Sequence, residues 1–89
     1  MPESEKQIAR QVHELLLTAR PERDDPNLIK AALFQSAIPA SELSPAKDEV
    51  FAAIKNLQTA TKKGASAVEG EKLLLDAINA AEHWAADAS

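Results

Sequence analysis

The chain contains only two glycines, Gly64 and Gly70, and they lie between its two longest apolar-periodic stretches. Two lysines followed by Gly64 predict a helix end, because cations favour the carbonyl end of a helix and glycine turns left-handed without strain. Ser66, with Glu69 three residues later, predicts a capping box that begins the next helix. Because almost no loop is left between them, the two helices are predicted to form an antiparallel pair.

The size and composition of the chain predict one small domain, residues 1–89, with a thin core. Its 89 residues are 45% hydrophobic, but only 3% are aromatic, and eighteen are alanines. Alanine favours helix, yet each buried alanine contributes little transfer free energy. A chain of this size is near the limit for a lone hydrophobic core. Dimerisation or a partner surface is therefore expected to supply part of the burial.

The chain has no cysteine, which excludes a disulfide, a thiolate nucleophile and a cysteine-based zinc site. The residues after Met1 are polar and do not resemble a secretion signal. No apolar run approaches the roughly 20 residues that span a bilayer. We therefore expect a cytoplasmic protein without a membrane span.

The net charge of −4 is unevenly distributed along the chain. Residues 1–64 carry nine acids and nine bases, whereas residues 65–89 carry five acids and Lys72 alone. No basic patch is apparent, so nucleic acid is not an expected partner, since phosphate binding needs clustered Lys and Arg. The acidic segment is predicted either to face a basic partner or to lie beside the lysines of the preceding helix. These lysines are Lys47, Lys55, Lys62 and Lys63.

A first helix is predicted over about 5–19, where apolar residues recur at helical spacing. Ser4 and Gln7 have the spacing of a capping box at its start. Pro21 is predicted to end it, because proline restricts the preceding residue and lacks an N–H donor.

Asp25 followed by Pro26 predicts the start of a second helix, with an N-cap and a proline at the first helical position. Pro39 is predicted to close it. This helix has two apolar sides, so it is expected either to be central or to present one side to a partner. One side has Leu28, Ile29, Ala32, Leu33 and Ser36, and the other has Ala31, Phe34 and Ile38.

Ser44 and Pro45 repeat the cap-plus-proline pattern and predict a third helix that reaches about Lys63. A fourth helix is predicted over about 67–86, with an apolar arc wider than one neighbouring helix covers. No strand-period alternation appears in the sequence. The predicted fold is all-α, a small up-and-down bundle of four short helices, with a three-helix core plus one short helix as the alternative.

The sequence offers no set of residues for catalysis, so we expect no enzymatic activity, no cofactor and no metal. The best-placed histidine is His83, which shares a predicted helical face with Asp76, Asn79 and Asp87. Such a line has the chemistry of a divalent-cation site or a pH-sensitive face. The ordinary polar surface of an amphipathic helix is the favoured interpretation.

The segment around the glycines resembles histidine phosphotransfer domains, which are four-helix bundles. Lys63, Gly64 and the second glycine, Gly70, match their motif, but Ala60 stands at the position of the phosphoacceptor histidine. The resemblance therefore implies a bundle that lacks phosphotransfer and still binds a receiver-like partner.

The chain is also similar in size and in several stretches to small helical bacteriocin immunity proteins of Gram-positive bacteria. The similar stretches are Lys6-Gln7-Ile8, Pro26-Asn27-Leu28-Ile29 and the segment from Leu43-Ser44 to Leu57. This resemblance implies self-protection by binding a toxin or a toxin–receptor complex, without catalysis.

The predicted function is non-enzymatic protein binding, as an inhibitor, an immunity factor or a regulatory adaptor, with a structural homodimer as the alternative. We expect Trp84, Leu75 and Phe34 as apolar contacts and Glu71, Asp76 and Glu82 as a charged rim. For Trp84 two interpretations are open, a buried core residue or an exposed anchor, because tryptophan is common in both settings.

Overall fold

The computed structural model describes residues 2–38 and 45–88 and shows a bundle of four α-helices. The helices are α1 (Pro2–Thr18), α2 (Pro26–Leu33), α3 (Pro45–Lys62) and α4 (Ala67–Asp87). A 3₁₀ turn, η1 (Phe34–Ala37), continues α2. No strand occurs among the described residues. The predicted all-α fold class is thus confirmed.

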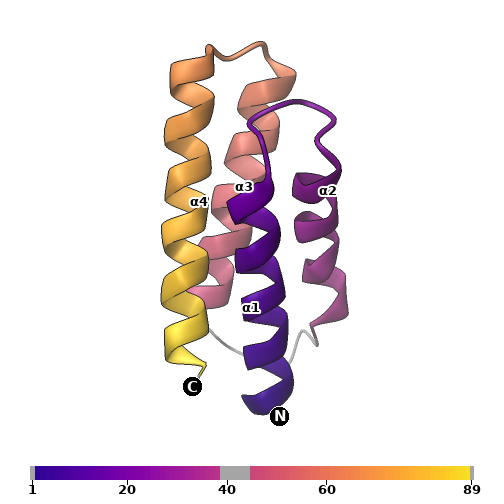
Figure 1. Cartoon of the computed structure of the whole chain (residues 1–89), viewed down its shortest axis with the longest axis vertical. Helices are drawn as coiled ribbons and strands as arrows, with labels where there is room; N and C mark the ends of the chain where they lie inside the picture. The colour runs from indigo at the N-terminus through magenta and orange to yellow at the C-terminus, as the bar shows by residue number, and fades with distance from the viewer. Residues whose placement is uncertain (1, 39–44, 89) are drawn as a thin grey trace.

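The helices alternate in direction, with α1 and α3 running one way and α2 and α4 the other (Figure 1). The largest contact joins α3 to α4, followed by α1 with α4 and α1 with α2. The contact between α2 and α3 is the smallest of the four between neighbouring helices. The bundle is elongated, with extents of 39 × 20 × 20 Å. The short helix α2 is therefore the helix least closely packed against its neighbours in the bundle.

The turn between α3 and α4 has the geometry that the sequence predicts. Gly64 has a φ of +80°, and its N–H donates to the Thr61 carbonyl at 3.2 Å. The Ala65 N–H donates to the Ala60 carbonyl at 3.0 Å, which completes a Schellman motif. Ser66 Oγ accepts the Glu69 N–H at 3.2 Å and caps α4. The antiparallel pairing of α3 and α4 follows from these local contacts.

The connection between α1 and α2 is held by side-chain caps. Asp25 is buried, and its Oδ2 accepts the Leu28 N–H at 3.0 Å, as expected of the N-cap of α2. Asn27 Nδ2 donates to Thr18 Oγ1 at 3.0 Å, which joins the start of α2 to the end of α1. The helix start predicted at Ser4 is wrong, because α1 begins at Pro2 and Ser4 lies inside it. The predicted cap Ser44 and the closing Pro39 lie outside the described residues.

Gly70 allows the α1–α2 connection to lie directly on α4. A Cβ atom built at Gly70 would lie 2.9 Å from Pro21 Cβ, closer than packed carbon atoms approach. A glycine in the second turn of a helix costs about 1 kcal/mol relative to alanine. Here that cost is offset by the close packing of the proline ring against the helix backbone.

The core runs the length of the bundle and is built from alanine and branched aliphatic side chains around one tryptophan. Trp84 is fully buried and meets Phe51 edge to face, with ring centroids 5.8 Å apart and an interplanar angle of 66°. The other fully buried large side chains are Leu16, Leu28, Ile54, Leu57, Val12 and Val50. The aromatic pair thus fills space that alanines alone leave open.

The burial of α2 does not follow the two apolar sides that the sequence predicts. Leu28 and Ala31 are buried, whereas Ile29 and Leu33 are exposed. Ser36 Oγ donates to the Leu33 carbonyl at 2.9 Å, so this polar side chain bonds back to the preceding turn. The predicted side that contains Ile29 and Leu33 is therefore divided between core and solvent, because Leu28 on the same side is buried.

Candidate binding surfaces

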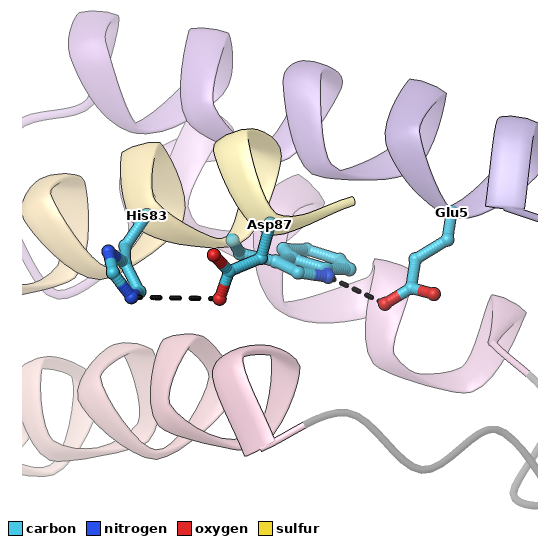
Figure 2. Close-up of polar contacts among 4 residues, drawn as sticks. Glu5, His83 and Asp87 are labelled. Carbon is cyan, nitrogen blue, oxygen red and sulfur yellow. Dashed lines mark hydrogen bonds and ion pairs between the residues drawn. The ribbon is translucent and has the colours of Figure 1, made fainter. Parts of the chain in front are cut away.

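Trp84, predicted as a partner contact, belongs to the core of the bundle. Its exposed fraction is 0%, and its Nε1 donates to Glu5 Oε1 of α1 at 2.9 Å. The dashed line that ends at Glu5 in Figure 2 marks this bond. Because the indole has no exposed atoms, its assignment to a partner surface is corrected, and the core interpretation holds. The indole N–H finds its acceptor within the chain, as a buried tryptophan requires.

The outer face of α4 carries the remaining predicted residues of this helix. Leu75 is 55% exposed and Val68 is 79% exposed. Glu71 lies four residues before Leu75 and Glu82 seven residues after it, so helical spacing puts all three on one stripe. Asp76 is also exposed, about 100° further round the helix. We call these five residues, Val68, Glu71, Leu75, Asp76 and Glu82, the acidic face.

Phe34 lies apart from the acidic face. It is half-buried in a groove of about 540 Å³ between α1 and α2. Its neighbours in this groove are Gln11, Glu14, Leu15, Thr18 and Lys30. In the ring of helices α1 separates α2 from α4, since α1 contacts both of them. Phe34 and Leu75 therefore do not form one continuous surface, and the predicted set of six residues is split.

The acids of α4 differ in how near they lie to the lysines of α3 and of the turn that follows it. Glu69 lines a hollow of about 490 Å³ together with Lys55 and Lys63, but no ion pair joins them. An ion pair joins His83 to Asp87, both on α4. Glu71 and Glu82 keep their charges exposed to solvent. The pairing of α3 with α4 places Glu69 beside Lys55 and Lys63, as the second interpretation of the acidic segment predicts, whereas Glu71 and Glu82 do not line this hollow.

His83 and Asp87 form a surface pair near the end of α4. His83 Nε2 lies 3.6 Å from Asp87 Oδ2, one turn along the helix (Figure 2). Their side chains are 69% and 57% exposed, so water screens the contact. No cluster of three metal-ligating side chains occurs within residues 2–38 and 45–88. The pair matches the ordinary polar surface that the sequence favoured.

The fold forms a basic cluster that the sequence did not predict. Arg23 of the α1–α2 connection meets Lys55 and Lys62 of α3 around a pocket of about 250 Å³. Gln58 and Thr59 complete its lining. The expectation of no basic patch is therefore wrong at this place. The cluster is hidden in the sequence because Arg23 and the two lysines come from different elements, and only the fold brings them together.

Comparison of the chain with protein-family models, curated proteins and solved structures found no match. The two family resemblances noted in the sequence therefore gain no support from overall similarity. At the position of the phosphoacceptor histidine, Ala60 lies half-buried in the wall of the hollow between α3 and α4. Within the described part of the chain, every helix is too short or too polar to cross a membrane.

Proposed function

We propose that this chain is a non-enzymatic binding module whose acidic face receives a basic, amphipathic segment of another protein. The observation that carries the proposal is the combination of exposed Leu75 with the unpaired acids Glu71 and Glu82 on one stripe. An apolar centre with a charged rim is the usual anatomy of a protein interface. An inhibitor, an immunity factor or a regulatory adaptor would each act in this way.

Charge determines the kind of partner that fits. The acidic face carries three carboxylates, and the exposed Lys72, three residues before Leu75 and four before Asp76, is the one basic residue of α4 on the same side of the helix, which leaves an excess of two negative charges there. Opposite charge on the partner would raise the association rate and make binding sensitive to salt. A partner helix with leucines flanked by lysines or arginines fits both the apolar centre and the rim. Trp84 and Phe34 have no part in this surface, since one is buried and the other lies between α1 and α2.

The proposal is tested by titrating the protein with a helical peptide of leucine and lysine, followed by backbone amide NMR. The expected result is a set of saturable shifts along the outer face of α4, weakened by salt. The matched ligand is the same peptide with glutamate in place of lysine, which should not bind. Charge reversal by Glu71→Lys, Asp76→Lys and Glu82→Lys should abolish binding of the basic peptide, and Leu75→Ser should weaken it.

Equal binding of the two peptides, or shifts that avoid α4, would overturn the proposal. If the basic peptide binds as expected, affinity capture from the source organism with the charge-reversed protein as control would identify the natural partner. A partner retained by the charge-reversed protein would use another surface.

The alternative function, a homodimer, is favoured by a separate observation on α2. Ile29 and Leu33 are 42% and 64% exposed on its outer side. A second copy would cover this side through a two-fold interface. Sedimentation equilibrium over a wide concentration range tests this. A dimer that dissociates in the Leu33→Lys variant is the expected result, and a monomer at all concentrations would exclude it.

A further inference from the structure

We propose that the pocket between the α1–α2 connection and α3 binds a phosphoryl group of a small molecule. This site is independent of the acidic face and goes beyond the proposed function. The pocket is lined by three cationic side chains and two neutral hydrogen-bonding ones, and by no acid: Arg23, Lys55, Lys62, Gln58 and Thr59.

The three cations have no partner within the described chain. No ion pair involves Arg23, Lys55 or Lys62 among the residues that the structure describes. Glu22 and Asp24, the sequence neighbours of Arg23, do not line the pocket. Three like charges around one small volume repel each other, and a bound anion would relieve that repulsion. The arrangement is therefore complementary to an oxyanion.

The geometry of the lining suits a phosphoryl group. Lys55 and Lys62 are seven residues apart, two helical turns, so both project from one side of α3. Gln58 and Thr59 lie between them along the helix and supply neutral donors. Arg23 approaches from a different element, and its planar guanidinium is suited to bidentate binding of a phosphate.

The size of the pocket selects a small ligand. A volume of about 250 Å³ accommodates a phosphate or a pyrophosphate.

The negative end of the α3 dipole, which would disfavour an anion, lies at the C-terminal end of the helix. The carbonyls of Ala60 and Thr61 there already accept N–H groups of the turn. Lys62 and Lys63 stand at this same end and offset its negative potential.

The probe is pyrophosphate, titrated into the full chain at constant ionic strength and followed by amide NMR, with inorganic phosphate as a second ligand. Expected are saturable shifts at the residues lining the pocket, tighter for pyrophosphate than for phosphate. The Lys55→Ala, Lys62→Ala double variant should bind about fivefold more weakly or worse. The control Lys72→Ala removes the same charge from exposed α4 and should leave affinity within about twofold.

Shifts that stay linear in pyrophosphate concentration, or that follow every lysine of the chain alike, would overturn the proposal. Equal affinity in the double variant would do the same. Circular dichroism of each variant verifies that the helices are intact, and the exposed positions of both lysines make a folding defect unexpected. Because Glu71, Asp76 and Glu82 take no part in this site, their reversal leaves the two proposals distinguishable.

Discussion

At the scale of single residues, the least predictable position is Gly70. Its sequence context, four residues after the cap of a helix, suggests only a weakened second turn. The reason for the glycine is Pro21, which lies 49 positions earlier in the chain and packs against the missing side chain. Trp84 presents the same difficulty, since composition left open a core or a surface role. Only its contacts with Phe51 and Glu5 decide between the two. A local sequence pattern does not reveal contacts between residues that are far apart in the chain, so the roles of these two positions could not be predicted.

Gly70→Ala is predicted to destabilise the protein, although alanine favours helix. The new Cβ would meet the rigid ring of Pro21, and overpacking of this kind costs typically about 1–3 kcal/mol. The helix-propensity gain of about 1 kcal/mol offsets part of that cost. Urea denaturation measures the free energy of unfolding. A stabilised Gly70→Ala variant would contradict the close packing.

Combining Gly70→Ala with Pro21→Gly tests whether the proline ring causes the destabilisation. In a Pro21→Gly background the obstructing ring carbons are absent, so Gly70→Ala should become stabilising by up to about 1 kcal/mol. The change of sign between the two backgrounds is the result that a purely local helix effect would not give.

At the scale of elements, local patterns predict the helix ends well where the capping contacts are themselves local. The turn between α3 and α4 is the best case, because Gly64 and Ser66 each form a hydrogen bond with a residue three positions away. Asp25 and Pro26 likewise predict the start of α2. The capping-box spacing of Ser4 and Gln7 does not mark a helix start, since the same spacing also occurs inside a helix. The continuation of α2 into a 3₁₀ turn also left no clear pattern in the sequence.

The helix α2 is predicted to be the first element to open, because it is short and makes the smallest contact with α3. Asp25→Ala removes its N-cap and should cost about 1 kcal/mol. Hydrogen exchange should then accelerate in α2 more than in α3 or α4. Asp24→Ala is the matched control, since Asp24 is exposed and adjacent and should leave exchange unchanged. Uniform acceleration in all helices would mean that α2 opens only with the whole bundle.

At the scale of the whole molecule, the fold separates charges that the sequence appears to mix. The bundle presents acids along α4 and gathers Arg23, Lys55 and Lys62 around a pocket. The acidic half of this pattern was predicted, because it lies on one helix. The basic half was missed, because it depends on which side of α3 the α1–α2 connection approaches. The split between Phe34 and the acidic face has the same origin, since it depends on the order of the helices around the bundle.

Reversal of Glu71, Asp76 and Glu82 to lysine is predicted to leave stability nearly unchanged. The net charge changes from −4 to +2, since each of three reversals adds two charges. None of the three acids is in an ion pair in the described structure, so the free energy of unfolding should change by no more than about 0.5 kcal/mol. Thermal unfolding at low and high salt measures this. A large loss that salt abolishes would reveal attraction to the α3 lysines.

The hydrogen bond between Glu5 and Trp84 has a consequence for how the protein is made. It joins positions 79 residues apart, so α1 can pair with α4 only after the residues between them have been synthesised. On the ribosome, synthesis proceeds at about 5–20 residues per second, and the pairing of α1 with α4 begins only when α4 leaves the exit tunnel. Apart from α4, the short helix α2 makes the largest contact with α1. Until α4 pairs with α1, the face of α1 that α4 covers is therefore exposed to chaperones and proteases.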